Sequence, residues 1–199
     1  MCRFIETVQI LNGKPLNLSF HEERFNRTRQ AFYPKASDIS LIDWIEKKIE
    51  NPGYGKHKLT IGYGKEIESF HISEYHQKDI KTLRIIETSS LEYSYKYADR
   101  EIFSVLKSGL DEKTEIIICL NGKVTDCSFA NLVFFNGNEW ITSDTPLLEG
   151  TKRKYLLEKG IIKEDTIYIY DISGFQKCSL INAMLDPGDI EIDIGGNIN

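Results

Sequence analysis

The sequence predicts an α+β fold in which two small domains share one cleft, and three observations lead to this prediction. A chain of 199 residues is long for one domain but can build two modest cores. Stretches rich in β-branched and aromatic residues alternate with stretches of helical periodicity along its length. No internal repeat or low-complexity segment interrupts them. We therefore expect a small α+β domain at residues 1–88 and a larger, β-rich domain at residues 89–199.

The first domain is expected to begin with a β-hairpin that leads into a helix. Residues 4–11 are rich in β-formers, and the Asn12-Gly13 pair after them is a strong signal for a tight turn between two strands. Ser19 and Glu22 have the spacing of a capping box, which predicts that a helix begins there.

The remaining elements follow from the spacing of apolar residues. Residues 40–50 carry apolar side chains near helical spacing before Pro52 and Gly53, which predicts a second helix. The other strands expected in the first domain are at residues 58–61, 66–73 and 82–86. In the second domain we expect helices at residues 98–107 and 151–159, and strands at residues 115–120, from 123, and at 131–135, 139–142 and 166–170.

Charge and composition exclude several classes of function. There are 25 basic and 30 acidic residues, so the net charge is −5, and 41% of the residues are hydrophobic, which is typical of a soluble globular protein. The acidic balance argues against nucleic-acid binding, which needs clustered positive charge. No apolar stretch approaches the roughly 18 to 20 residues of a membrane helix, and the first residues do not resemble a signal peptide. We expect a cytoplasmic protein that acts on a small molecule and binds neither nucleic acid nor membrane.

Metal binding and several common enzyme motifs are not indicated. The spacing of His71 and His76 suits neither one face of a helix nor one face of a strand. The sequence contains no G-x-S-x-G, Walker or G-x-G-x-x-G motif, which weakens hydrolase, nucleotide-triphosphatase and dinucleotide-enzyme interpretations. Without a C-x-x-C pair, the cysteines are expected to be reduced and mostly buried; they are Cys2, Cys119, Cys127 and Cys178.

Five stretches carry the residues that could act together. Residues 21–25 (HEERF) place an arginine on the first helix, residues 95–100 (YKYADR) place a lysine before another helix, and residues 122–132 (GKVTDCSFANL) place a carboxylate at a strand end. Residues 145–153 (TPLLEGTKR) put a glycine at a helix start, and residues 181–184 (INAM) end the series. In this order and spacing they resemble the class IV aminotransferases, a family that includes branched-chain and D-amino-acid transaminases and 4-amino-4-deoxychorismate lyase. The resemblance covers nearly the whole chain and is closest to the lyase.

The resemblance implies a two-domain fold type IV architecture like that of D-amino-acid aminotransferase, shortened at the N terminus, with pyridoxal 5′-phosphate in the cleft between the domains. Lys96 matches the lysine that holds the cofactor aldehyde as a Schiff base and moves a proton in catalysis. Arg24 matches the arginine that binds the cofactor phosphate. Asp126 matches the carboxylate beside the pyridine nitrogen, where the family generally has glutamate. Leu148 matches an apolar residue packed on the ring.

The family resemblance also implies two backbone cradles for the phosphate. Thr151 and Lys152 open a helix after Gly150, so their N–H groups match the anion-binding amides of the family. The family usually has threonine where this chain has Lys152, so a hydroxyl contact is lost and the amide is kept. Asn182 and Ala183 match a second cradle after the last strand.

The implied activity is a pyridoxal-phosphate-dependent lyase of folate biosynthesis that eliminates pyruvate from 4-amino-4-deoxychorismate to give 4-aminobenzoate. The alternatives are a class IV aminotransferase acting on a small amino acid, of the branched-chain type, and a non-catalytic relative. A D-amino-acid transaminase is disfavoured, because the arginine of its carboxylate trap has no match in residues 61–64 (IGYG). The resemblance also implies a homodimer. Four cations remain open as partners of the substrate carboxylates: Arg27, Arg29, Lys58 and Arg100.

Overall fold

The computed structural model describes residues 3–50 and 52–198, so Cys2 lies outside the described residues. The chain forms two compact units, one made of Met1–His76 and Tyr95–Asp99 and the other of Gln77–Ser94 and Arg100–Asn199. The boundary expected after residue 88 falls inside the second unit, because the strand that ends at Thr88 pairs with another strand of that unit. Both units combine helices with β-sheets, which confirms the predicted α+β class.

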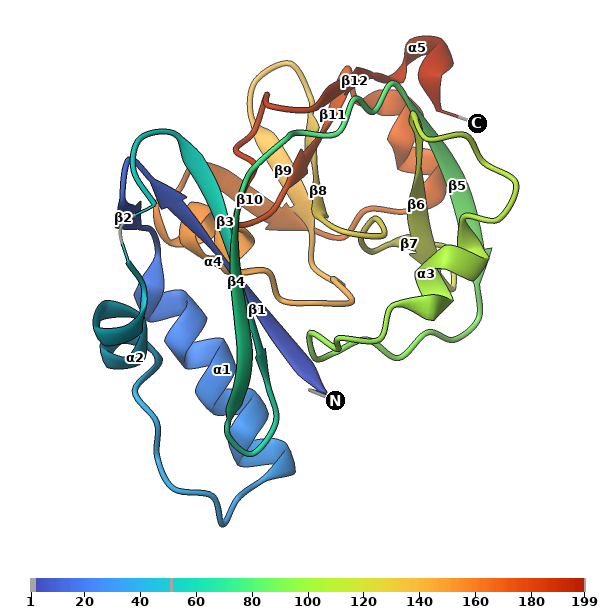
Figure 1. The fold of residues 1–199 in the computed structure, drawn as a ribbon. Helices are drawn as coiled ribbons and strands as arrows, with labels where there is room; N and C mark the ends of the chain where they lie inside the picture. Colours follow the sequence, from blue (N-terminus) through green and yellow to red (C-terminus); the bar gives the residue numbers. More distant parts are fainter. Residues whose placement is uncertain (1–2, 51, 199) are drawn as a thin grey trace. The chain divides into compact units, whose positions relative to one another are not determined.

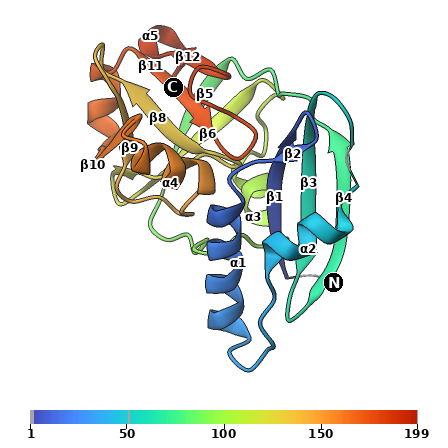
Figure 2. The ribbon, with the colours of Figure 1, turned by 90° about the vertical axis from the view of Figure 1, so that its left-hand side faces the viewer.

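The first unit is an antiparallel sheet with helices α1 and α2 on one face (Figure 1, Figure 2). Its strand order is β2-β1-β3-β4. Its elements are β1 (Phe4–Leu11), β2 (Lys14–Pro15), α1 (Leu18–Phe32), α2 (Leu41–Lys48), β3 (Lys56–Tyr63) and β4 (Ile67–Glu74). Alternate residues of β1 and β3 face the helices, and there they pack around Phe25, Leu41 and Ile45 to form the core.

The predicted hairpin is confirmed. The capping box predicted at the start of α1 is wrong. Residues 12 and 13 turn the chain with φ values of 50° and 78°, which asparagine and glycine tolerate best. The N-cap of α1 is Asn17, which adopts a left-handed conformation and makes no side-chain cap. Ser19 and Glu22 therefore do not form a capping box. Glu22 instead accepts a hydrogen bond (2.9 Å) from Ser40, the residue that caps α2.

The second unit contains sheets with the strand orders β10-β9-β8-β11-β12 and β5-β6-β7. Its elements are β5 (Thr82–Thr88), α3 (Glu101–Leu106), β6 (Thr114–Leu120), β7 (Lys123–Val124), β8 (Asn131–Phe135), β9 (Trp140–Ser143), α4 (Thr151–Glu158), β10 (Ile162–Asp165), the 3₁₀-helix η1 (Ile169–Gly174), β11 (Lys177–Ile181), β12 (Glu191–Asp193) and α5 (Ile194–Asn197). Leu156 of α4 packs against Val133, Ile162 and Ile181. This contact fixes α4, whose first turn carries several predicted site residues.

The strand predicted at residues 166–170 is wrong. The Tyr168 N–H donates to the Asp171 carboxylate (2.8 Å), and the chain turns into η1 instead of remaining extended. The nearby strand lies earlier, at β10, where it pairs in parallel with β9. Residues 162–165 are mostly charged, so their composition does not indicate a strand.

The described cysteines agree with the prediction of buried thiols. Cys119, Cys127 and Cys178 are free and buried. In residues 3–50 and 52–198, no helix is long and apolar enough to cross a membrane. Within the same ranges, no group of three or more His, Cys, Asp or Glu side chains is placed to hold a metal ion.

Candidate active site

A buried charged cluster lies between β1 and α1 in the first unit. Glu6 is fully buried, and its carboxylate accepts hydrogen bonds from Nε (2.8 Å) and Nη2 (2.7 Å) of Arg24. Nδ1 of His21 lies 2.7 Å from the same carboxylate. His21 and Arg24 are three residues apart on α1 and therefore share one helix face, so both reach Glu6.

Electrostatics fix the charge states of this cluster. Burial opposes the charge of Glu6, but the Arg24 charge and the hydrogen bonds from Arg24 and His21 outweigh it and lower the Glu6 pKa to about 2. Burial lowers the pKa of His21 against the opposing effect of Glu6, and the Arg24 and Lys96 charges lower it further. At neutral pH Glu6 is therefore an anion, His21 is neutral and Arg24 is a cation.

Lys96 belongs to the same unit as this cluster. Its carbonyl accepts a hydrogen bond from the Ile5 N–H (3.0 Å), so its segment lies alongside β1. Its ammonium is close enough to His21 to influence the His21 pKa. The structure thus brings Arg24 and Lys96, which come from distant stretches of the sequence, to the surroundings of one histidine.

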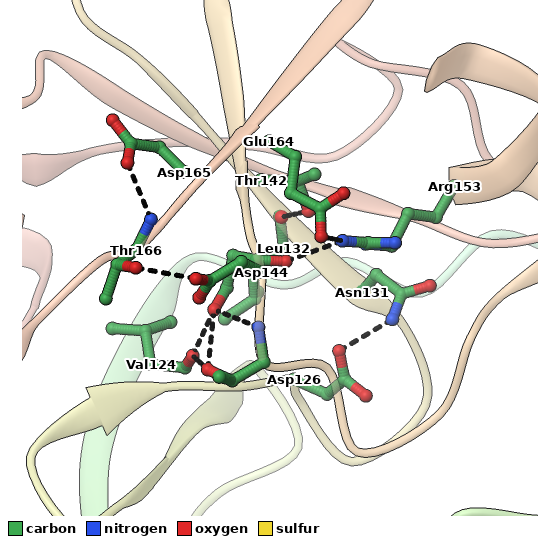
Figure 3. A network of polar contacts seen from close by, with 12 residues as sticks. Val124, Asp126, Asn131, Leu132, Thr142, Asp144, Arg153, Glu164, Asp165 and Thr166 are labelled. Carbon is green, nitrogen blue, oxygen red and sulfur yellow. Dashed lines mark hydrogen bonds and ion pairs between the residues drawn. The ribbon is translucent and has the colours of Figure 1, made fainter. Parts of the chain in front are cut away.

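The second unit holds a buried carboxylate, Asp126, which is 5% exposed. Its Oδ1 accepts a hydrogen bond from Asn131 Nδ2 (2.6 Å; Figure 3), and its Oδ2 accepts one from the Leu148 N–H (2.9 Å). Burial raises the Asp126 pKa to about 6, although both of these hydrogen bonds and the Arg153 charge act to lower it. Asp126 is therefore held in a fixed orientation by two donors and titrates close to neutral pH.

Asn131 connects Asp126 to the start of α4. Its Nδ2 also donates to the Leu148 carbonyl (2.9 Å), so Leu148 takes part in the site through both of its backbone groups. A Cβ added at Gly150 would lie 2.0 Å from Asn131 Oδ1. Only glycine therefore allows the chain before α4 to pass this close to Asn131.

The first turn of α4 is buried and rich in positive charge. Gly150 is its N-cap and offers no side-chain cap, so the N–H groups at Thr151 and Lys152 are among those that the helix itself leaves unsatisfied. Lys152 is 4% exposed, and its ammonium pairs with Asp186 (2.6 Å). A cation at the positive end of a helix dipole is unfavourable, and Asp186 offsets this cost.

Arg153 is the second buried cation of this turn. Its Nη2 donates to the Ser143 carbonyl (2.7 Å). It also pairs with Glu164 (3.0 Å), as Figure 3 shows. Its Nε is buried without a hydrogen-bond partner among the residues that the structure describes. The Arg153 charge reaches Asp126 and favours the ionised carboxylate.

Asn182 is linked to the loop that carries Asp126. Its Nδ2 donates to the Phe129 carbonyl (3.2 Å), and its Oδ1 accepts from the Met184 N–H (2.8 Å). Ala183 is half-buried in the tight turn between these partners. Leu148 and Asn182 therefore both form hydrogen bonds to the loop of the second unit that contains Asp126 and Phe129.

Sequence reasoning missed three residues that hold these arrangements: Glu6, His21 and Asn131. Glu6 could have been noticed as a carboxylate on the apolar, inward side of β1. His21 precedes Arg24 by one helical turn, and Asn131 follows Asp126 within one short loop. No local signal shows that these groups are hydrogen-bond partners, because each pairing depends on the tertiary fold.

Comparisons with known proteins agree with the residue pattern. The family described as Amino-transferase class IV matches residues 3–188. An uncharacterized protein of Haemophilus influenzae is 37% identical over 187 residues, which are 92% of this chain and 98% of that protein.

Solved structures extend the comparison to the fold. A crystal structure from Haemophilus somnus, provisionally assigned as a 4-amino-4-deoxychorismate lyase, is 34% identical with a TM-score of 0.85 and covers 92% of this chain and 97% of its own. A Mesorhizobium loti structure, provisionally assigned as an amino-acid aminotransferase, is 16% identical with a TM-score of 0.79, covers 97% of this chain and 99% of its own, and shows the fold alone.

Proposed function

Because the chain belongs to the class IV aminotransferase family, whose members depend on pyridoxal phosphate, we propose that it is a lyase that converts 4-amino-4-deoxychorismate into 4-aminobenzoate and pyruvate. The observation that supports the lyase most directly is the similarity, over nearly the whole chain, to the Haemophilus somnus structure. The sequence pattern around Asp126 favours the same activity.

The chemistry of the described residues fits the cofactor. The carboxylate of Asp126 accepts from Asn131 Nδ2 at one oxygen and from the Leu148 N–H at the other, and a carboxylate has about four acceptor positions, so a pyridine N–H can be bound as well. Glu6 takes two of the five N–H donors of Arg24. The close approach of Gly150 to Asn131 leaves no space for a side chain at the start of α4, and a glycine before a helix N-terminus is typical of an anion-binding cradle.

Pyridoxal phosphate, when bound, supplies an electron sink for cleavage next to the amine-bearing carbon. In this proposal Asp126 keeps the pyridine nitrogen protonated, and it does so in its ionised form, above a pH of about 6. By the family resemblance, Arg24 and the first amides of α4 would hold the phosphate, and the turn at Asn182 and Ala183 would add further amides. The Leu148 side chain would supply an apolar contact to the ring.

Lys96 has two tasks in this proposal. Its Nζ would hold the cofactor covalently, and its neutral amine would take the proton from the amine-bearing carbon of the substrate. Both tasks require the neutral amine of Lys96. Glu6 keeps Arg24 in place through the two hydrogen bonds that it accepts from the guanidinium.

The experiment is a product assay on the purified holoenzyme. We expect 4-amino-4-deoxychorismate to yield 4-aminobenzoate, detected by its fluorescence, and pyruvate, detected with lactate dehydrogenase. Lys96→Ala should abolish both signals, while Lys47→Ala, at an exposed position of α2, should keep them. Turnover retained in Lys96→Ala would overturn the assignment.

A second arm of the assay tests the aminotransferase alternative. The holoenzyme is mixed with a branched-chain amino acid and then with a 2-oxo acid. Transfer of the amino group without pyruvate release from 4-amino-4-deoxychorismate would replace the lyase with an aminotransferase. Absence of both activities and of any absorbance from bound cofactor would point to a non-catalytic relative.

We also propose a homodimer located in the cytoplasm. The family resemblance supports the dimer, and the composition supports the location. Light scattering coupled to size-exclusion chromatography should give twice the chain mass of 22.9 kDa. A single-chain mass at micromolar concentration would contradict the dimer.

A further inference from the structure

The second unit contains a buried ion pair that plays no part in the cofactor contacts proposed for Asp126 and α4. Glu115 is fully buried on β6, where residues 116–119 are buried and apolar. Its Oε2 pairs with the Lys107 ammonium (2.8 Å). Replacing a buried ion pair with apolar side chains of similar volume often leaves stability unchanged or higher, so stability alone does not explain a carboxylate in this strand.

The other oxygen of Glu115 contacts the loop between β7 and β8. Glu115 Oε1 accepts hydrogen bonds from the Ser128 N–H (3.3 Å) and from the Ile116 N–H (3.0 Å). The Ser128 carbonyl accepts a hydrogen bond from Nη2 of Arg100. Both backbone groups of Ser128 are therefore bound by charged side chains, which form stronger hydrogen bonds than neutral ones.

The two cations of this arrangement lie at the two ends of α3. Arg100 is the N-cap of α3 and Lys107 is its C-cap. The Arg100 guanidinium also lies 5.3 Å from the centre of the ring of Phe103, which is buried. One end of α3 is thus attached to Ser128 and the other to Glu115.

The loop held in this way joins Asp126 to its hydrogen-bond donor. Residues 127–130 lie between Asp126 and Asn131, and a backbone hydrogen bond (2.9 Å) connects the first and last of them. The conformation of this loop determines whether Asn131 Nδ2 reaches the Asp126 carboxylate, as it does at 2.6 Å. A displacement of Ser128 is therefore transmitted to the contact between Asn131 and Asp126.

We propose that Glu115 is a positioning residue that, through Ser128, keeps the Asp126 carboxylate in a fixed orientation. That this carboxylate binds the pyridine nitrogen of the cofactor rests on the proposed function. The role of Glu115 depends on the oxygen that it offers to the loop, and Lys107 offsets the cost of burying the charge. Glu115→Gln keeps such an oxygen, whereas Glu115→Met removes it.

The test measures the Asp126 pKa, about 6 in the parent protein, by NMR titration of isotope-labelled aspartate without added cofactor. We expect Glu115→Met to raise this pKa, because the released loop withdraws Asn131, a donor that favours the ionised form. Glu115→Gln removes the same charge but should leave the pKa unchanged. Lys107→Met is the matched control: it breaks the ion pair and should lower the free energy of unfolding without moving the Asp126 pKa. The Arg153 charge also acts on Asp126 and is the same in every variant.

A double variant shows whether Glu115 acts through Asn131. Glu115→Met combined with Asn131→Ala should have the same Asp126 pKa as Asn131→Ala alone, whereas additive shifts would contradict this route. If Glu115→Met does not fold, Arg100→Met removes the other side-chain hydrogen bond to Ser128 from a half-buried position. Arg100→Met should also raise the Asp126 pKa, and an unchanged value in that variant would overturn the proposal.

The outcomes separate the positioning role from the proposed function, because the titrations use neither cofactor nor substrate. An unchanged Asp126 pKa in Glu115→Met, or an equal shift in Glu115→Gln or Lys107→Met, would overturn the positioning role. If the pKa shifts as expected but 4-amino-4-deoxychorismate gives no 4-aminobenzoate, the positioning role stands and the lyase proposal fails. In an active holoenzyme, the acid limb of the kcat/KM profile should move to higher pH in Glu115→Met and stay in place in Lys107→Met.

Discussion

Replacing Glu6 with glutamine tests the role of the buried cluster in the first unit. The side chain keeps its shape and one carbonyl oxygen but loses its charge and one acceptor. Arg24 then loses the buried carboxylate that accepts from both its Nε and its Nη2. Breaking a buried pair by removing one partner typically costs about 3–5 kcal/mol.

The lowered Glu6 pKa reflects the same contacts. It falls from 4.5 to about 2, which corresponds to about 3 kcal/mol of stability at neutral pH. Because the pKa is lowered in the folded state, this contribution is complete above pH 4.5 and is lost as the pH falls toward 2. Both routes give a loss of about 3 kcal/mol or more for Glu6→Gln at pH 7.

The chain offers a specific probe for this measurement. It contains two tryptophans, Trp44 on α2 of the first unit and Trp140 on β9 of the second. In a Trp140→Phe background, Trp44 fluorescence follows urea unfolding of the first unit alone. Glu46→Gln, at an exposed position of α2, is the matched control and should change the free energy of unfolding by less than about 0.5 kcal/mol.

Two results would refute this reasoning. If Glu6→Gln unfolds within about 1 kcal/mol of the parent at pH 7, the carboxylate is not the main support of Arg24. If the difference between parent and variant does not shrink between pH 4.5 and pH 2, the lowered pKa of Glu6 is incorrect.

Three further outcomes are expected. Gly150→Ala should push Asn131 away and lower both stability, by about 2 kcal/mol or more, and cofactor affinity, whereas Gly174→Ala, which has open space, should be neutral in denaturation and binding assays. Asn131→Ala removes a donor that favours the ionised form of Asp126, so the Asp126 pKa should rise above about 6 and the acid limb of the kcat/KM profile should move to higher pH; an unchanged limb would contradict this. Burial raises the pKa of three thiols, so iodoacetamide at pH 8 should label them only after unfolding, as peptide mapping can show; they are Cys119, Cys127 and Cys178.

The elements that could be predicted from the sequence are those fixed by local chemistry. Asn12-Gly13 and Asn121-Gly122 both adopt positive φ at tight turns, because these residues tolerate the left-handed region. The strand predicted at residues 131–135 has the bounds of β8, since its apolar residues form a short continuous run.

The failed predictions concern positions where tertiary partners decide. Ser19 and Glu22 satisfy the spacing of a capping box, but Glu22 contacts Ser40 from a distant segment instead. Residues 166–170 contain β-formers, yet the Asp171 carboxylate turns the chain at Tyr168. Such contacts are not encoded in the periodicity of a single segment.

The residues of the candidate site also fall into two groups: those that the sequence suggests and those that only the structure shows. The predictions of Arg24 and Asp126 come from the family resemblance, in which each is a chemical type required at one place in an ordered series, and their roles stay predictions. The residues that orient them, Glu6 and Asn131, came only from the structure, because their roles depend on hydrogen bonds across strands and loops.

The central claim is that Lys96 is the covalent anchor of a pyridoxal phosphate ring. Borohydride reduction of the protein incubated with the cofactor, followed by peptide mapping, tests this claim most directly. We expect one modified peptide, with the added mass on Lys96, and no such peptide in Lys96→Ala. Modification at Lys58 or Lys152 in place of Lys96, or no modification at all, would contradict the account.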